Sequence, residues 1–285
     1  MMTNKIKYVM IILLCFTAGI LFQKYIPDII IFLKPETSAE KPFQESTRTP
    51  VDMNNIKTGR VMFALVIGQS NAANYGEILY RSKHSVYNYY DGRLYIAEDP
   101  LLGASGTKGS VWGMLGDSLI EKGYCDKVIF VSIAVGSTSI GCWSDGRCSI
   151  MLKETMNELK KNNIKLTHIF WHQGEEDNYN NTPADIYKSR LKKILDTIRG
   201  YGEDAPLFVS IASFNPWVKG KPEGIGYEIR RAQKEFIKEN RNVFIGPDTD
   251  TIVSSFDRFD RVHFSESGMK KYSQLWINSI IRRRK

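Results

Sequence analysis

The sequence has few residues of the kinds that bind metals or build disulfide frameworks. Its 285 residues include only four cysteines and four histidines, and no Cys/His spacing is typical of a structural zinc site. His168 and His172 lie in a strand-like segment, without the helical H-E-x-x-H context of a zinc hydrolase. The sequence also lacks internal repeats and low-complexity blocks. It therefore predicts neither a metal site nor a cofactor, and it excludes a repeat architecture.

The charge balance is basic without being extreme. Lysine and arginine number 39 against 31 aspartates and glutamates, which gives a net charge of +8, and part of it lies in the terminal cluster Arg282-Arg283-Arg284-Lys285. No binding motif and no interleaving of basic and aromatic residues accompanies this charge. We therefore predict that the protein does not bind nucleic acid, although a basic surface would attract anionic glycans over long range.

The first 58 residues differ in character from the rest. Residues 8–22 form an uncharged apolar run after Lys5 and Lys7, and a second apolar patch follows at 25–33. Together the two patches are long enough to cross a bilayer, and no small-x-small cleavage site closes the first run. We therefore predict a signal-anchor or transmembrane segment over residues 1–34. The alternative is a cleaved signal peptide, which would give a secreted or periplasmic protein.

A polar stretch with several prolines follows. Residues 35–58 are typical of a flexible linker, and residues 59–285 are enough for one folded domain with a proper core. Positive charge before the apolar run leaves the domain outside the cytoplasm. We expect a single-pass protein of the bacterial inner membrane whose folded domain lies in the periplasm.

Two cysteines bracket a short turn-like loop in this domain. Cys142 and Cys148 enclose five residues. In an oxidising compartment such a pair forms a disulfide, and the alternative is two unpaired thiols. The predicted location favours the disulfide.

A strand-like run near the start of the domain ends at a serine. Residues 61–67 are all apolar, Gly68 follows, and Ser70 comes two positions later. An apolar run without polar alternation predicts a parallel strand covered on both faces, and glycine permits a sharp turn at its end. Ser70 would then lie at the carboxyl edge of the sheet, where open α/β folds bind ligands. It is a candidate nucleophile, and the alternative is a serine that caps a helix.

Near the other end of the domain, an acid precedes a histidine by three residues. These are Asp260 and His263. A serine hydroxyl needs a neutral imidazole to take its proton, and the imidazole needs a carboxylate to orient it. His84 lies in a polar, tyrosine-rich stretch, so His263 is the best-placed base. The alternative is a surface histidine near an exposed aspartate at a helix cap.

Two further strand-like runs end in polar clusters. Gly136 follows the run 128–135, and Gln173 follows the run 167–172. Ester hydrolysis passes through an oxyanion, and each preorganised hydrogen-bond donor stabilises it by about 2.7–4 kcal/mol. The backbone N–H groups of Ser70 and Gly136, together with the side-chain amide of Gln173, are therefore predicted to form an oxyanion hole.

Strand-like and helix-like segments alternate along the domain. This alternation predicts an α/β fold, a three-layer α/β/α sandwich with a central parallel sheet of about five strands. Beyond the three runs above, strands are expected at 206–212 and 242–246, and helices at 110–122, 150–162, 183–199, 227–239 and 265–283.

Four sequence blocks occur in the order found in SGNH-type hydrolases: Gly68-Gln69-Ser70-Asn71, Gly136-Ser137-Thr138-Ser139-Ile140, Trp171-His172-Gln173-Gly174-Glu175 and Asp260-Arg261-Val262-His263. The chain most resembles the sialate O-acetylesterase and acetylxylan-esterase branch over roughly residues 60–280. The resemblance implies the flavodoxin-like SGNH fold. It makes Ser70 the nucleophile, His263 the base, Asp260 the acid that orients it, and Gly136 and Gln173 oxyanion donors. It also gives supporting positions to Gln69, Asn71 and Glu175.

The sequence departs from its relatives at two positions. Ser137 follows Gly136, where relatives commonly have a second glycine. This difference affects the local backbone conformation and therefore the direction in which the Gly136 N–H points. Ala72 stands where a Gly-x-Ser-x-Gly elbow would have its second glycine, which argues against an ordinary α/β-hydrolase.

The residues and the resemblance together predict a serine esterase. It would remove O-acetyl or other acyl groups from a carbohydrate, such as sialic acid or a cell-surface polysaccharide, through an acyl-enzyme on Ser70. Two alternatives stay open, a non-catalytic glycan-binding or assembly protein on the same scaffold and a glycan O-acyltransferase. Hydrolysis and transfer use the same residues and differ in how the acceptor site is shaped and dried.

Overall fold

The computed structural model of the protein describes residues 41–282. The predicted membrane anchor over residues 1–34 lies outside this range. No helix within the described range is long and apolar enough to cross a membrane.

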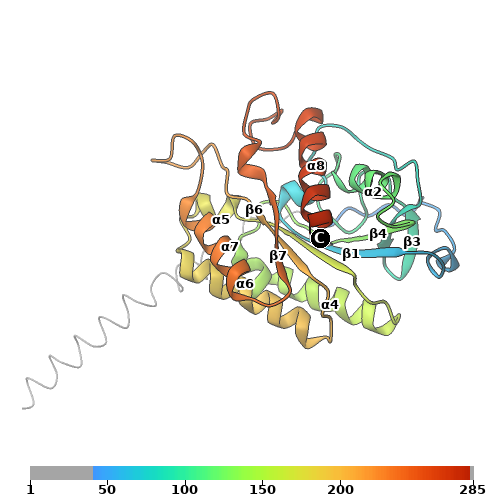
Figure 1. Cartoon of the computed structure of the whole chain (residues 1–285). Coiled ribbons are helices and arrows are strands. Elements are labelled where there is room, and N and C mark those ends of the chain that lie inside the picture. The colour runs from blue at the N-terminus through green and yellow to red at the C-terminus, as the bar shows by residue number, and fades with distance from the viewer. Residues whose placement is uncertain (1–40, 283–285) are drawn as a thin grey trace, which may run out of the picture. The chain divides into compact units, whose positions relative to one another are not determined.

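Within residues 41–282, seven strands form one sheet in the order β3-β2-β4-β1-β5-β6-β7 (Figure 1). All neighbouring strands are parallel except the antiparallel pair β2 and β3. The strands are β1 (Val61–Gly68), β2 (Val86–Tyr90), β3 (Arg93–Ile96), β4 (Lys127–Ser132), β5 (His168–His172), β6 (Leu207–Ile211) and β7 (Val243–Asp248).

The sheet is wider than the five strands that the sequence predicts. All five are present, and the hairpin of β2 and β3 extends the sheet beyond β4. The hairpin was not predicted because its strands contain polar residues, which are not typical of a buried strand. The clearest example is Asn88, which is completely buried in β2. Its side chain accepts a hydrogen bond from the Leu102 N–H (2.7 Å) and donates to the Phe130 carbonyl (3.3 Å). A buried polar side chain is tolerated where such partners exist, and these partners are remote in the sequence.

The five predicted strands have the flavodoxin-like order. Counted along the chain, they lie as 2-1-3-4-5 across the sheet, in the order β4-β1-β5-β6-β7. In this order the chain reverses direction across the sheet at the boundary between β1 and β5, and ligands of open α/β folds bind at the carboxyl ends of the strands there. The segments that follow β1 and β5 carry Ser70 and Gln173.

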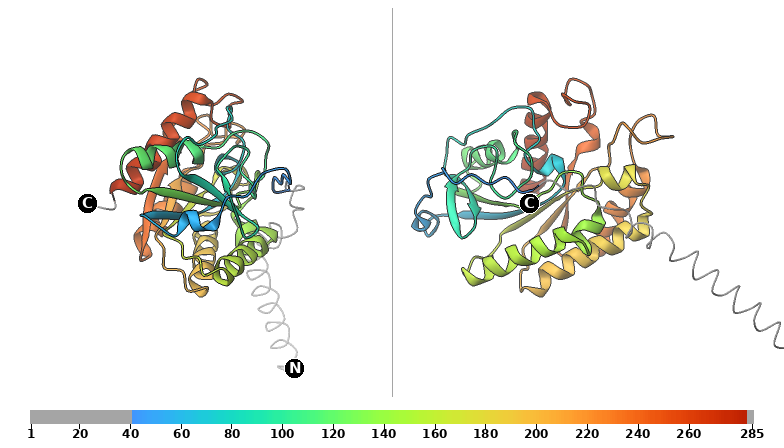
Figure 2. Two further views of the ribbon diagram at one scale, coloured as in Figure 1. Left: turned by 90° about the vertical axis from the view of Figure 1, so that its right-hand side faces the viewer. Right: turned by 180° about the vertical axis from the view of Figure 1, so that it is seen from behind.

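Helices cover both faces of the sheet, which confirms the predicted three-layer α/β/α architecture. Helices α2 and α8 lie on one face and α4, α6 and α7 on the other (Figures 1 and 2). The five predicted helices are all found close to their expected positions. The α-helices of the described residues are α2 (Trp112–Glu121), α3 (Ile140–Ser144), α4 (Arg147–Lys161), α5 (Glu175–Tyr179), α6 (Ala184–Gly200), α7 (Tyr227–Glu239) and α8 (Glu266–Arg282).

Strand β1 is buried on both faces, as its apolar run predicts. Its side chains alternate between the two cores, so Leu65 packs on the side of α4, α6 and α7 while Val66 packs on the side of α2 and α8. Trp112 of α2 and Trp276 of α8 fill the second core, with ring centroids 5.7 Å apart. Because β1 is buried on both faces, its position in the sheet is fixed. This also fixes where Ser70, two residues after the end of β1, lies at the edge of the sheet.

Residues 41–58 pack on the domain and do not form a free linker, which corrects the sequence prediction for this part of 35–58. The Phe43 N–H donates to the Ala104 carbonyl (2.8 Å), and the Val51 N–H donates to the Leu94 carbonyl of β3 (2.7 Å). A short 3-10 helix, η1 (Met53–Ile56), then leads into β1. The prolines and polar residues of this segment are typical of a flexible linker, so its composition did not indicate that it is ordered. Its order comes from backbone hydrogen bonds to loops that are distant in the sequence.

Candidate active site

The turn after β1 brings Ser70 to the edge of the sheet. Gly68 has a φ of 143°, and a side chain on it would place its Cβ 2.0 Å from the His172 carbonyl oxygen of β5. Only glycine fits so close an approach between two backbones. Ser70 then opens the short 3-10 helix η2 (Ser70–Ala72) and is nearly buried, with 5% of its surface exposed.

Asp260 and His263 form a hydrogen-bonded pair, as predicted. The His263 Nδ1 lies 2.6 Å from Asp260 Oδ2, and Asp260 Oδ1 accepts the backbone N–H groups of Val262 (2.9 Å) and His263 (2.7 Å). Partial burial raises the pKa of Asp260, but these hydrogen bonds outweigh it and hold the pKa below its usual value. An ionised carboxylate on Nδ1 leaves the other ring nitrogen, Nε2, as the one able to accept a proton.

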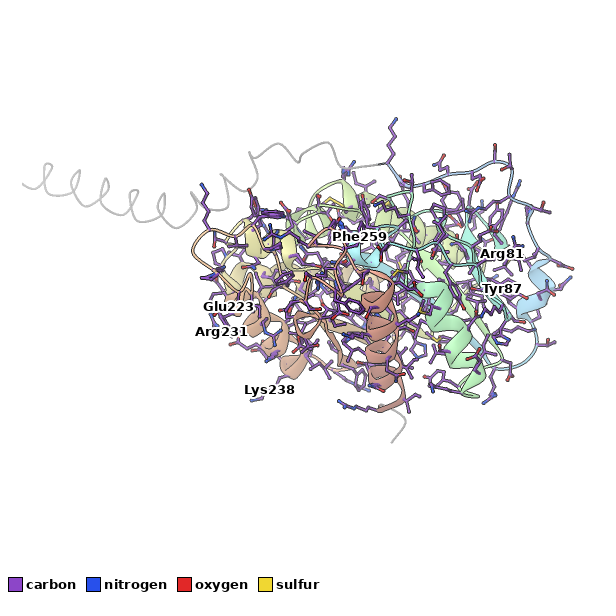
Figure 3. The ribbon with its side chains drawn as sticks, turned by 90° about the horizontal axis from the view of Figure 1, so that it is seen from above. Arg81, Tyr87, Glu223, Arg231, Lys238 and Phe259 are labelled. Carbon is purple, nitrogen blue, oxygen red and sulfur yellow. A yellow bond between two sulfur atoms is a disulfide. The ribbon has the colours of Figure 1, made fainter. Side chains whose placement is uncertain are left out.

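The His263 ring is also held by aromatic contacts. The Tyr75 ring stacks on it at a centroid distance of 5.0 Å and an interplanar angle of 23°. Phe259, labelled in Figure 3, lies 6.4 Å from the same ring in the loop before α8. Tyr75 follows Ser70 by five residues, so the nucleophile segment itself packs on the candidate base.

Asn71 and Glu175 join the Ser70 segment to β5 and to the histidine loop. The Asn71 Nδ2 donates to Glu175 Oε1 (3.0 Å) and lies 3.5 Å from the Val262 carbonyl oxygen. The same Oε1 lies 3.0 Å from His172 Nε2, and His172 Nδ1 lies 2.9 Å from the Tyr272 hydroxyl of α8. This chain of contacts links the segment that bears Ser70 to the loop that bears His263.

The charge of Glu175 is maintained inside the protein. Burial raises its pKa, but the neighbouring His172 and the hydrogen bond from Asn71 outweigh that effect and lower the pKa to about 2. The sequence prediction gave Glu175 a supporting role, and its contacts have that character.

Gln69 connects the turn after β1 to the turn after β5. Its Oε1 accepts the backbone N–H groups of Gly174 (3.3 Å) and Glu176 (3.2 Å). Gly174 has a φ of 154°, and a Cβ there would lie 2.0 Å from the Ala212 carbonyl oxygen. Gln69 therefore holds two glycine-dependent turns together.

Gln173 does not supply the oxyanion donor that the sequence predicted. Its side chain is completely buried, and its Nε2 donates both to the Thr138 carbonyl (3.0 Å) and to Asp177 Oδ2 (2.5 Å). Both amide hydrogens are therefore used inside the protein. Gln173 instead fixes the loop after β4, and Asp177 assists by accepting the Ile140 N–H (2.7 Å). Asp177 was visible in the sequence only as one of three consecutive acids after Gly174.

Gly136 lies beside the site, and its N–H already has an acceptor. It donates to the Ser105 Oγ (2.8 Å), which in turn lies 3.2 Å from the Tyr75 hydroxyl. A Cβ at Gly136 would lie 2.3 Å from that hydroxyl oxygen, so a side chain at this position would displace the Tyr75 ring that stacks on His263. Ser137 adopts a φ of 53°, the left-handed conformation that a second glycine would favour. Ser105 gave no signal in the sequence because it lies in a loop outside the four blocks.

Arg258 is a buried residue of the histidine loop that the sequence reasoning missed. Its guanidinium donates to the carbonyls of Ile252 (2.6 Å), Thr249 (3.2 Å) and Val262. The rings of Phe214 and Phe264 lie 4.9 and 4.4 Å from it. Burial lowers its pKa to about 10. The guanidinium thus ties the backbone next to His263 to the segment after β7.

The predicted disulfide between Cys142 and Cys148 is present and links α3 to α4. Between them, the Trp143 Nε1 donates to the Thr138 Oγ1 (3.1 Å). The disulfide therefore braces the loop that begins at Gly136. Among residues 41–282, no group of three or more His, Cys, Asp or Glu side chains is arranged to hold a metal ion.

Comparison with solved structures shows the same fold in several proteins, one of which is described as a carbohydrate esterase. A protein from Arabidopsis thaliana matches with a TM-score of 0.62 at 16% identity, over 79% of this chain and 98% of that one. The family 3 carbohydrate esterase of Clostridium thermocellum matches with a TM-score of 0.52 at 16% identity, over 78% and 96%. NanS also matches with a TM-score of 0.52 at 16% identity, over 79% and 98%.

The family comparison covers most of the chain. No curated protein matches it significantly. The model of the family described as "carbohydrate esterase, sialic acid-specific acetylesterase" matches residues 61–282. That range begins at the first residue of β1 and includes all four sequence blocks. The protein is therefore a carbohydrate esterase that belongs to the family of sialic acid-specific acetylesterases.

Proposed function

We propose that this protein is a serine esterase that removes O-acetyl groups from a carbohydrate through an acyl-enzyme on Ser70. The observation that carries the proposal is the Asp260–His263 pair, with 2.6 Å between Oδ2 and Nδ1, held against the segment that bears Ser70. The family of the chain and the fold it shares with esterases support the same reaction class.

In the first half of the reaction, Ser70 Oγ attacks the carbonyl carbon of the acetyl ester while His263 Nε2 takes the hydroxyl proton. The tetrahedral intermediate then collapses. The bond from carbon to the sugar oxygen breaks, and the proton passes from His263 to that oxygen. Asp260 stabilises the imidazolium throughout, and its lowered pKa keeps it ionised. In the second half, water attacks the acetyl-Ser70 ester with His263 again as the base; the bond from carbon to Ser70 Oγ then breaks, the proton passes from His263 to Oγ, and acetate leaves.

Two backbone donors are proposed for the oxyanion. The Ser70 N–H is the first of helix η2 and has no acceptor within that helix. The second is the Gly136 N–H, which donates to the Ser105 Oγ (2.8 Å) in this structure, so the oxyanion would have to replace that hydroxyl as the acceptor. Gln173 supports this arrangement indirectly, since its bond to the Thr138 carbonyl fixes the loop that carries Gly136.

We further propose that the enzyme works outside the cytoplasm, tethered to the bacterial inner membrane by residues 1–34. The Cys142–Cys148 disulfide supports an oxidising compartment. The sugar in the proposal is sialic acid or an acetylated cell-surface polysaccharide, and the family description supports the former.

The test is acetate release by the full-length protein in mild detergent, with an aryl acetate and an O-acetylated sialic acid as substrates. Ser70→Ala should lower the rate at least a thousandfold, since removal of a nucleophile leaves only binding and oxyanion stabilisation. Ser118→Ala on α2 is the matched control and should retain full activity.

The remaining outcomes discriminate among the alternatives. If well-folded protein binds the acetylated sugar and releases no acetate, the protein is a glycan-binding module and the proposal is wrong. If the acetyl group appears on an added sugar hydroxyl in preference to water, the protein is an acyltransferase. Full activity in Ser70→Ala would exclude the mechanism.

A further inference from the structure

A pocket of about 670 Å³ lies beside the candidate active site. Its volume is within the range of about 300–1,000 Å³ that small-molecule sites occupy. Residues 41–44 form one wall, and Tyr75 and the loop 106–108 form others. The reaction proposed above assigns no role to this pocket.

The wall formed by residues 41–44 precedes the part of the chain that the family model matches. The family match begins at residue 61, so this segment lies outside it. Phe43 is held in place by two backbone hydrogen bonds, from its N–H to the Ala104 carbonyl (2.8 Å) and from the Gly103 N–H to its carbonyl (3.0 Å). The neighbouring Ser105 N–H donates to the Ala134 carbonyl (2.9 Å) at the end of the β4 segment. The wall is therefore built onto the loop that contacts Gly136.

The position of the pocket relative to His263 is defined by Tyr75. One face of the Tyr75 ring is covered by His263, so the pocket meets the remaining surface of this ring. The pocket and the imidazole therefore share Tyr75 as a neighbour. The acetylated sugar must lie next to Ser70, and the pocket is placed for the sugar unit joined to it.

The charge of the pocket selects among sugars. Two of its lining residues, Lys41 and Lys108, are cations, and its lining contains no carboxylate. Both lysines are exposed, and the Lys108 Nζ lies 4.3 Å from the centre of the Phe259 ring, next to the histidine loop. Lysine ammonium groups bind carboxylates and other anions as point charges, and the Phe43 and Tyr75 rings offer apolar surface for a sugar ring.

We propose that this pocket is a second glycan subsite that binds a negatively charged sugar unit adjacent to the acetylated one, with Lys41 and Lys108 as its anion-recognising residues. The proposal rests on the proposed esterase function and deepens it. It makes the preferred substrate an acidic oligosaccharide or polysaccharide rather than a free monosaccharide. It also gives the segment before β1 a part in substrate choice.

The test measures binding without turnover, so that it stays informative even if the esterase proposal fails. Full-length protein in mild detergent is titrated calorimetrically with a non-acetylated α2,8-linked sialic acid disaccharide, with free sialic acid and with neutral xylobiose. We expect the acidic disaccharide to bind more tightly than either other sugar. Lys41→Met combined with Lys108→Met should weaken its binding about tenfold, since two exposed charge contacts of modest strength are lost together.

The same calorimetric titration is carried out with a single variant of the pocket and with a control variant far from it in the sequence. Lys41→Met alone should weaken binding of the acidic disaccharide measurably, whereas Lys153→Met, an exposed lysine on α4, should not change it. Equal affinities for the disaccharide and the monosaccharide would overturn the proposal. So would equal affinity for xylobiose, or undiminished binding by the double variant.

If the enzyme is active, a kinetic comparison adds a second readout. The ratio of kcat/KM for the acetylated acidic disaccharide to that for acetylated xylobiose should fall about tenfold in the double variant. A ratio that does not change would count against the subsite and leave the esterase function intact. Absence of acetate release from every ester would reject the esterase function and leave the binding result to decide on the subsite.

Discussion

Substitution of Glu175 by glutamine tests whether a buried charge holds the active-site segments together. The carboxylate is 3% exposed, and its Oε1 lies 3.0 Å from both Asn71 Nδ2 and His172 Nε2. Its Oε2 has no hydrogen-bond partner among the described residues. Glutamine has the same shape, keeps an oxygen for Asn71 and places its amide nitrogen at the Oε2 position. The substitution therefore removes the charge, and it also places a buried amide NH2 group at the Oε2 position, which can only add to the cost.

The expected loss of stability follows from the pKa of Glu175. Its pKa is about 2 in the folded protein against an ordinary value of 4.5. At 1.36 kcal/mol per pKa unit, this difference corresponds to about 3 kcal/mol of stabilisation by the ionised form. Because the folded-state pKa is depressed, the contribution is fully present above pH 4.5 and is lost as the pH falls toward 2. Glu175→Gln should therefore cost about 3 kcal/mol at pH 7, and the cost should shrink below pH 4.5.

The assay is urea unfolding of the full-length protein in mild detergent at several pH values, for the parent, Glu175→Gln and Glu154→Gln. Glu154 is exposed on α4, and its substitution should change the unfolding free energy by less than about 0.5 kcal/mol. A loss below about 1 kcal/mol in Glu175→Gln at pH 7 would refute the reasoning. A difference that widens as the pH falls would refute it as well.

Three other substitutions probe separate parts of the site. Asp260→Asn should lower kcat about 10²–10⁴-fold without unfolding the protein, because the His263 tautomer and imidazolium lose their carboxylate; a rate within threefold of the parent would show that Asp260 does not orient the base. Arg258→Met should lower the unfolding free energy by about 2–4 kcal/mol, because buried carbonyls lose their donor. Thermal unfolding measures this loss, and Arg258→Lys should restore part of it if hydrogen bonding is the cause. Replacement of Cys142 and Cys148 by serine should cost about 2 kcal/mol, as expected for a short disulfide loop; unchanged thermal stability would mean that the disulfide does not brace the loop.

The placement of residues 41–58 bears on how the enzyme should be studied. Phe43 and Val51 pair through their backbones with loops of the domain. A fragment that begins at residue 59, the predicted domain boundary, would remove these contacts and one wall of the pocket. Soluble fragments should therefore begin before residue 41.

Much of the fold could be read from local patterns. The apolar runs before Gly68 and Gly136 predict parallel strands, because strands covered on both faces need mostly apolar sequence, and the segment before Gln173 has an apolar centre, Ile169-Phe170-Trp171, between two histidines. The β2 and β3 hairpin escaped this reasoning because Asn88 is buried in it with partners from residues 102 and 130. The ordered structure of residues 41–58 was not predicted either, because its backbone hydrogen bonds to distant loops cannot be recognised from residue composition.

In the candidate site, too, contacts between residues close in sequence could be predicted, whereas contacts between distant residues could not. The Asp260–His263 pair spans three residues, so its hydrogen bond was predictable from spacing. Gln173 was expected to face the substrate, but its amide is taken by Thr138 and Asp177. The strand pattern correctly predicted that Gln173 lies at the carboxyl edge of the sheet. The direction of its side chain depends on the two acceptors, Thr138 and Asp177, that the folded structure places beside it.

The sequence by itself determined the α/β architecture, the edge of the sheet that carries the candidate site, and the residues proposed as nucleophile, base and orienting acid. These depend on hydrophobic periodicity, on glycine at a turn and on short spacings, all of which are local properties of the chain. Only the tertiary structure decided which donors are engaged, that Arg258 and Ser105 support the site, and that residues 41–44 border a cationic pocket. Hydrogen bonds and charges act over a few ångströms in space, and the groups they join here are separated by tens of residues in the chain.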